Sequence, residues 1–78
     1  MNDNEILELQ KKIKEGKEVT LHLDNGNVQK SITIDSVRIM PKYGNPADQP
    51  NLVEFGDKNE LLKSYRVDTS IIKSATVA

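Results

Sequence analysis

The stretch over residues 19–39, VTLHLDNGNVQKSITIDSVRI, constrains the fold most, because apolar and polar residues alternate along it on both sides of a turn-forming run. Successive side chains of a strand point to opposite faces of a sheet, so this alternation is typical of two half-buried strands. The run Asp24-Asn25-Gly26-Asn27 supplies the residues that tight turns prefer. The stretch therefore predicts a β-hairpin. Its alternating apolar residues are Leu21, Leu23, Val28, Ile32 and Ile34.

The second strand of this hairpin contains a break in its pattern. Ile32 and Ile34 occupy even positions, whereas Val37 and Ile39 occupy odd ones. A straight strand cannot change its buried face in this way. We therefore expect a bulge or sharp bend around Asp35-Ser36, which would let one long strand serve two sides of a closing barrel. Two short strands joined by a tight turn would explain the pattern equally well.

Residues 2–15 are predicted to form one amphipathic helix. Asn2 is a suitable N-cap, and Glu5 stands three residues later, as in a capping box. Gly16 is suited to end the helix, because glycine readily adopts the left-handed conformation found there. The apolar stripe consists of Ile6, Leu9 and Ile13, with Leu7 at its edge.

The rest of the chain predicts a loop followed by three more strands. Residues 40–51 contain all three prolines, and this loop is either a binding element or a simple connector. Short strands are expected at 52–55, 61–67 and 71–77, with a polar turn at 56–59 and a 3₁₀ turn at 68–70.

The expected fold is accordingly α+β and mainly β, in a single domain over residues 1–78. The N-terminal helix (2–15) precedes a β region (18–77), which is either a five-stranded, strongly bent antiparallel sheet or an SH3-like or Sm-like barrel.

Composition excludes several classes of function. The chain has no cysteine, one histidine, and 11 basic residues against 12 acidic ones. Disulfides and thiolate metal sites are therefore impossible, and His22 lacks the partners of a zinc site, so it is interpreted as an exposed strand residue. There is no glycine-rich phosphate loop and no nucleophile motif, so we expect neither an enzyme nor a metal or cofactor. No apolar run is long enough for a membrane span, and we expect a cytoplasmic protein.

The second half of the chain, residues 31–77, resembles the WYL domain, an Sm-like SH3-type β-barrel of bacterial transcriptional regulators and defence-associated proteins. The resemblance lies in Tyr65-Arg66-Val67-Asp68, followed by Ile71 or Ile72 and then by Ser74-Ala75-Thr76-Val77. Leu52-Val53-Glu54-Phe55 stands where the family has Trp-Tyr-Leu, a motif that this sequence lacks.

The resemblance implies a ligand-sensing fold in which Arg66 contacts an anionic ligand, such as a nucleotide or nucleic acid, beside Tyr65 and Tyr43. A guanidinium suits that role, because it binds phosphate or carboxylate through two hydrogen bonds. The alternative, which small sheets favour, is a cross-strand ion pair. The acidic residues available for such a pair are Asp68, Glu54 and Asp35.

A basic surface is a further candidate for phosphate binding. From residue 19 onward the seven basic residues are matched by seven acidic ones, so a mixed charged surface is the alternative. The basic residues that one face could gather are Lys30, Arg38, Lys42, Lys63, Arg66 and Lys73.

These observations predict a small non-enzymatic binding module of the SH3-like or Sm-like type that acts through a protein partner or as a homo-oligomer. The first alternative is a WYL-like sensor of a nucleotide or nucleic-acid ligand. The second is a phage or mobile-element accessory protein, which its small size suggests.

Overall fold

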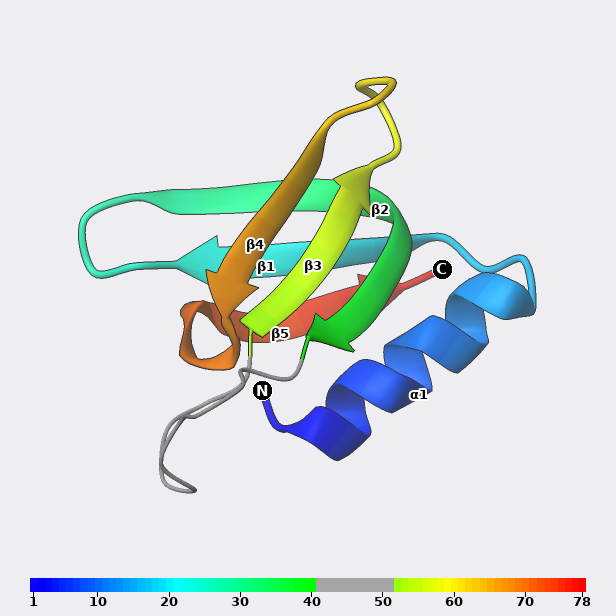
Figure 1. Cartoon of the computed structure of the whole chain (residues 1–78), viewed down its shortest axis with the longest axis horizontal. Coiled ribbons are helices and arrows are strands. Elements are labelled where there is room, and N and C mark those ends of the chain that lie inside the picture. Colours follow the sequence, from blue (N-terminus) through cyan, green and yellow to red (C-terminus); the bar gives the residue numbers. More distant parts are fainter. Residues whose placement is uncertain (41–51) are drawn as a thin grey trace.

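The computed structural model describes residues 1–40 and 52–78, which form one helix and a five-stranded antiparallel sheet (Figure 1). The α+β, mainly β expectation is confirmed. In chain order the elements are α1 (Asp3–Lys14), β1 (Val19–Asp24), β2 (Gln29–Met40), β3 (Leu52–Asp57), β4 (Ser64–Asp68), the 3₁₀ helix η1 (Thr69–Ile71) and β5 (Ile72–Val77).

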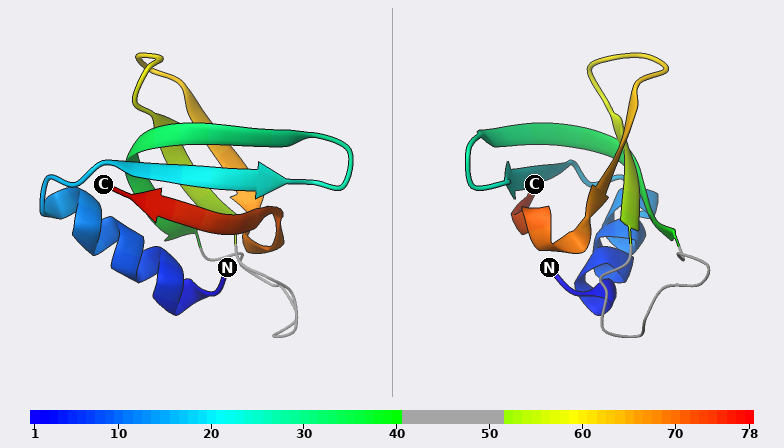
Figure 2. Two further views of the ribbon diagram at one scale, coloured as in Figure 1. Left: turned by 180° about the vertical axis from the view of Figure 1, so that it is seen from behind. Right: turned by 60° about the vertical axis from the view of Figure 1, so that its left-hand side comes forward.

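The sheet is bent and open. Its strand order is β4-β3-β2-β1-β5, so β4 and β5 are its two end strands, and every neighbouring pair is antiparallel. Of the two predicted architectures, the chain forms the bent sheet, and the sheet does not close into a barrel. Figure 2 shows the β1–β2 hairpin and the β3–β4 pair crossing at a steep angle.

The predicted bend in β2 is confirmed. Ile34 pairs with Asp57 of β3, and the next paired residue, Ser36, faces Gly56, so one extra residue lies in β2 at this point. Ile34 and Val37 are both buried even though they differ in parity. The bulge therefore lets the first half of β2 pair with β1 and the second half pair with β3, while both halves bury the same face.

Gly56 of β3 lies against the side chains of the bulge. A Cβ atom built on Gly56 would lie 2.5 Å from Asp35 Oδ1 and 3.0 Å from Ser36 Oγ. Both distances are shorter than an ordinary van der Waals contact, so a side chain at position 56 would require the exposed side chains of Asp35 and Ser36 to turn away.

The helix covers one face of the bent sheet and completes the core. Its start is capped as predicted: the Glu5 backbone N–H donates to Asn2 Oδ1 (2.9 Å), and the Asn2 N–H donates to Glu5 Oε1 (3.1 Å). The Met1 nitrogen donates to the carbonyls of Thr69 (3.3 Å) and Ile72 (3.0 Å), which ties the start of α1 to η1 and β5. The buried core residues are Ile6, Leu9, Val19, Leu21, Ile32, Ile34, Val37, Val53, Phe55 and Ile72.

The strand expected at 61–67 begins later than predicted. Leu61 and Leu62 lie in the β3–β4 turn and are 94% and 98% exposed. The Lys63 N–H donates to the Glu60 carbonyl (3.3 Å), and Leu62 has a φ of 66°, so the chain is still turning at these residues. The alternation of Leu61 with later residues was therefore misleading, because turn geometry overrides a two-residue pattern at a strand end.

Several other boundaries differ from the prediction. The 3₁₀ helix η1 spans Thr69–Ile71 rather than 68–70, and β5 begins at Ile72 rather than at residue 71. Val28 lies in the hairpin turn and is 60% exposed, so it is not part of the buried face. Strand β2 extends through Met40, and β3 continues to Asp57. The remainder of the predicted loop, residues 41–51, lies outside the described residues.

Candidate functional site

Two of the predicted ligand-binding residues, Arg38 and Arg66, lie on the polar face of the sheet with Glu54 between them. Arg38 of β2 is the register partner of Glu54 of β3, and Glu54 is the register partner of Arg66 of β4. Both Arg38 Nε and Arg38 Nη2 lie 3.1 Å from Glu54 Oε1, and Arg66 Nε lies 2.9 Å from Glu54 Oε2. Each oxygen of this one carboxylate thus accepts from a different arginine.

Arg38, Glu54 and Arg66 form a row across the sheet, and the two arginines lower the pKa of the Glu54 carboxyl group. The hydrogen bond from Arg66, followed by the one from Arg38, holds the pKa of Glu54 below its usual value of 4.5. The two arginine side chains remain 61% and 62% exposed, whereas that of Glu54 is 21% exposed. The structural alternative predicted for Arg66, a cross-strand ion pair, is therefore present, with Glu54 as the acid. An anionic ligand at this row would have to compete with the Glu54 carboxylate.

Tyr65 lies on the opposite face of β4 and is surrounded by an aromatic ring and two cations. Its ring stacks on Phe55 with a centroid distance of 5.4 Å and an interplanar angle of 24°. Lys30 Nζ and Lys63 Nζ lie 5.8 Å and 5.4 Å from the Tyr65 centroid, within cation–π range. Lys63 also pairs with Glu60 (2.9 Å), which raises the pKa of Lys63.

Tyr65 also borders an apolar groove on the open side of the bent sheet, which is called its mouth below. The groove encloses about 210 Å³ and separates the β1–β2 hairpin from β4. This volume lies below the range of roughly 300–1,000 Å³ typical of small-molecule sites, so the groove suits one or two side chains better than a cofactor. The residues that line the groove are Leu23, Asn25, Val28, Lys30, Ile32, Phe55, Tyr65, Val67 and Ile71.

The predicted site residues therefore do not form one cluster. Arg38 and Arg66 lie on the outer face, whereas Tyr65 faces the groove. Tyr43 and Lys42 lie outside the described residues. Within the described residues, Lys30 and Lys63 flank Tyr65, while Lys73 belongs to β5 and its Nζ donates to the Ser70 carbonyl (2.9 Å). The basic residues that the sequence singled out are thus distributed over different surfaces in the described ranges.

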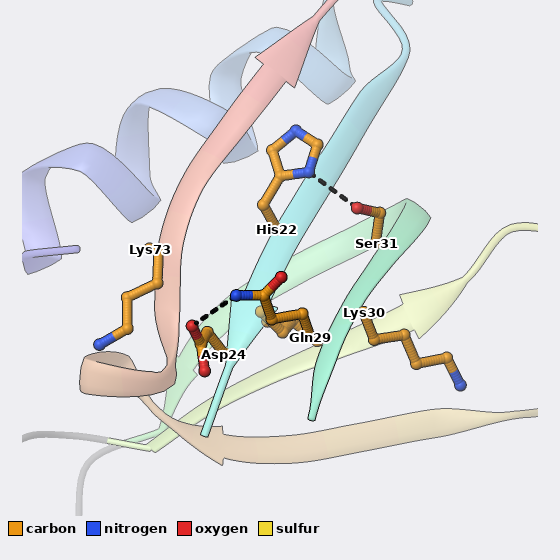
Figure 3. Close-up of a pocket in the computed structure, with 7 residues that line it drawn as sticks. His22, Asp24, Gln29, Lys30, Ser31 and Lys73 are labelled. Carbon is orange, nitrogen blue, oxygen red and sulfur yellow. Dashed lines mark hydrogen bonds between the residues drawn. The ribbon is translucent and has the colours of Figure 1, made fainter. Parts of the chain in front are cut away.

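A polar hollow of about 320 Å³ lies on the outer face beside β1 (Figure 3), and sequence reasoning missed it. His22 is one of the residues that line it: Nδ1 lies 2.8 Å from Ser31 Oγ, and Nε2 lies 2.7 Å from Thr76 Oγ1. His22 is thus a half-buried residue held by hydroxyl groups of both neighbouring strands. The signal in the sequence that could have revealed the hollow is that small hydroxyl residues occupy outward-facing positions of β1, β2 and β5.

Asp24 lies at the end of the same hollow. Its carboxylate accepts from the Gly26 N–H (2.8 Å) and from Gln29 Nε2 (3.2 Å), and these hydrogen bonds, together with the charge of Lys73, lower the pKa of Asp24. Its hydrogen bonds are those of an Asx turn, which supports the turn role expected for Asp24.

The hydrogen bonds of His22 differ from those of a catalytic triad. Both ring nitrogens of His22 face hydroxyl oxygens, so the carboxylate that orients a histidine in a triad is not in place among the described residues. No group of three or more His, Cys, Asp or Glu side chains that could hold a metal ion occurs in the described part of the chain. Over the same residues, no helix is long and apolar enough to cross a membrane.

The fold and surfaces define a small α+β domain with an open antiparallel sheet, an apolar groove at its mouth and a polar outer face. Comparison of the chain with protein-family models, with curated proteins and with solved structures finds no match. The resemblance to WYL domains therefore stays a prediction that rests on residues 65–77.

Proposed function

We propose that this chain is a small non-enzymatic binding module that acts through contact with another protein chain or with copies of itself. The observation that carries the proposal is the open sheet, which has β4 and β5 as its two end strands and an apolar groove beside β4. End strands present backbone N–H and C=O groups that can pair with an incoming strand. The proposal includes a cytoplasmic location, which the absence of cysteine from the sequence supports.

The hydrogen-bond pattern indicates which residues of β5 form its outer edge. Glu18 and Ala78 exchange both backbone hydrogen bonds, at 3.2 Å and 2.9 Å. In an antiparallel pair such residues alternate with ones whose backbone groups point the other way. By this alternation Thr76 directs its backbone groups to β1, and Ala75 directs its groups away from β1.

The same reasoning applies to β4. The Asp57 N–H donates to the Lys63 carbonyl (3.1 Å), so Lys63 is directed toward β3. Ser64 therefore points its backbone groups away from β3, as does Arg66 two residues later. Ser64 and Ala75 are thus edge positions at which a proline would remove an edge N–H and spare the internal ladder.

Proline variants at these two edges test the proposal. We expect the wild-type chain to show a mass above that of the monomer by light scattering, or to capture a partner from lysate. Ser64→Pro and Ala75→Pro should each reduce that binding, with circular dichroism confirming that the sheet is retained. If β4 of one copy pairs with β5 of the next, mixing the two variants should restore dimers, because each contributes one intact edge.

The proposal fails if the wild-type chain stays monomeric at the highest soluble concentration and captures no protein. It also fails if both proline variants fold and bind as the wild type does. The mixing experiment separates copy-to-copy pairing from recruitment of another protein. If the natural partner is a different protein, the two variants should both stay monomeric when they are mixed.

The grouping of Arg38 and Arg66 favours a second candidate, a sensor of a nucleotide or nucleic-acid ligand of the WYL kind. Two exposed guanidinium groups flank a single carboxylate, so the row carries one excess positive charge. Glu54→Gln should strengthen phosphate binding, since it removes the competing anion, and Arg66→Ala should weaken it. A panel of nucleotides and short oligonucleotides that produces no thermal shift, even in Glu54→Gln, would exclude this candidate.

A further inference from the structure

A row of apolar residues on the core face of the sheet ends at β5 with an exposed side chain. Ile34 of β2 is the register partner of Val19 of β1, and Val19 is the register partner of Val77 of β5. Ile34 and Val19 are 3% and 0% exposed, whereas Val77 is 40% exposed. β5 is an end strand, and no strand of the described ranges lies beyond it (Figure 1). One more strand beside β5 would therefore extend the apolar row and cover Val77.

The outer face of the same three strands carries a row of threonines. Thr33 of β2 is the register partner of Thr20 of β1, and Thr20 is the register partner of Thr76 of β5. The hydroxyl oxygens of Thr20 and Thr33 lie 2.9 Å apart. Threonine pairs directly opposite each other stabilise a sheet. This row also ends at β5, so both faces of the sheet end in residues that suit a further strand of the same kind.

The two end strands differ in how well they are protected against pairing. Charged side chains, prolines and bulges are the features that keep the edge of a sheet from pairing. Two of the five residues of β4, Arg66 and Asp68, are charged. In β5 the only charged residue is Lys73, which lies beside the shift in register with β1 at the start of the strand. Residues 74–77 are uncharged and contain no proline, so they form the less protected edge.

We propose that β5 pairs antiparallel with β5 of a second copy, across a two-fold axis at Thr76. Ala75 directs its backbone groups away from β1, and by the same alternation so does Val77. With Thr76 opposite its own counterpart, Ala75 of each copy exchanges backbone hydrogen bonds with Val77 of the other. This inference rests on the proposed function and narrows it to one edge and one partner.

This register continues the rows on both faces and separates the charges. On the core face Val77 lies opposite Ala75 of the second copy, and on the outer face the two threonine rows meet at Thr76. The two Lys73 side chains are six residue steps apart, or roughly 20 Å, which exceeds the screening length of about 8 Å at physiological ionic strength. A two-fold contact of this kind closes with two copies and leaves no free β5 edge.

A single cysteine tests the position of the axis, because the chain contains no cysteine of its own. Residues opposite each other at a non-hydrogen-bonded pair have Cα atoms about 4.5 Å apart, within the range of a disulfide. Thr76→Cys should therefore form a disulfide-linked dimer in mild oxidant, and a reductant should reverse it. Ser74→Cys is the matched control on the same strand, since its two copies would lie roughly 13 Å apart. Equal crosslinking of the two variants, or none in Thr76→Cys, would contradict the axis.

Charge exchange at the same position tests the pairing without oxidation. Thr76 is exposed, and Thr76→Lys and Thr76→Glu each place two like charges opposite one another. Each should raise the dissociation constant of the dimer at least about tenfold. An equimolar mixture of the two should recover dimers, because opposite charges then face each other. Leu7→Lys is the control, since it adds a charge at a 51% exposed site on α1. Sedimentation equilibrium measures each constant, and thermal melts verify the fold.

The proline variants separate this inference from the proposed function. Pairing through β5 alone changes the expectation for Ser64→Pro, which should dimerise as the wild type does, while Ala75→Pro should be monomeric. Self-association that is lost in Ser64→Pro, or that both charge variants at Thr76 leave unweakened, would overturn the inference and leave the proposed function standing. A monomer that captures another protein would have the same meaning, and a monomer that captures nothing would overturn both.

Discussion

Phe55 is the residue whose truncation should destabilise this fold most clearly. It is completely buried at the centre of β3, between its register partners Val37 of β2 and Tyr65 of β4. It belongs to the core that also contains residues of α1, β1 and β5, and it stacks on Tyr65 at 5.4 Å. Its side chain therefore joins the two halves of the bent sheet.

The expected loss can be estimated from these contacts. Truncating a buried phenylalanine to alanine costs about 3–5 kcal/mol, from lost transfer free energy and the cavity that remains. A chain of 78 residues has a total free energy of unfolding of about 4–12 kcal/mol. Phe55→Ala thus removes a large share of the stability. For a domain of this size the melting temperature should fall by at least about 12 °C.

Urea denaturation and thermal melts followed by circular dichroism measure this loss. Phe55→Leu is the matched control: it keeps most of the apolar volume, loses the ring contact with Tyr65 and should cost about 1 kcal/mol. A double-mutant cycle with Tyr65→Leu should give a coupling of about 0.5–1.5 kcal/mol. If Phe55→Ala melts within a few degrees of the wild type, the assignment of Phe55 as the central core residue is wrong.

Three further perturbations test the bulge, the arginine row and the helix cap. Gly56→Ala should change the free energy of unfolding by less than about 1 kcal/mol, because its Cβ would displace only the exposed side-chain ends of Asp35 and Ser36; a larger loss in urea melts that Asp35→Ala relieves would show that these side chains are held in place. The folded pKa of Glu54 is depressed, so the stability that the ionised Glu54 contributes is complete above its usual pKa of 4.5 and is lost as the pH falls through the folded pKa. The wild type should therefore melt at a higher temperature than Glu54→Gln near neutral pH, and this difference should shrink below about pH 4.5. A difference that does not change with pH would contradict the pairing with Arg66. Asn2→Ala should cost about 1 kcal/mol by removing the N-cap, and an unchanged melt would show that α1 does not depend on it.

The sequence determined the local elements of this protein. The capping box at Asn2, the turn at residues 24–27 and the change of parity around Asp35 each depend on residues close together in the chain, and the structure bears out all three. Local hydrogen bonding and the two-residue period of strands are physical rules that act over a few residues. The order of helix and strands could be predicted for this reason.

Only the tertiary structure decided how the halves of the sheet meet. The alternation of β2 allowed either a closed barrel or an open sheet, and the difference depends on how far β2 bends at its bulge and on how α1 packs against it. The same holds for the candidate surfaces, because Glu54 meets Arg38 and Arg66 only through the registers of β2, β3 and β4. Contacts between residues far apart in the chain follow from packing of the whole core, which no short pattern encodes.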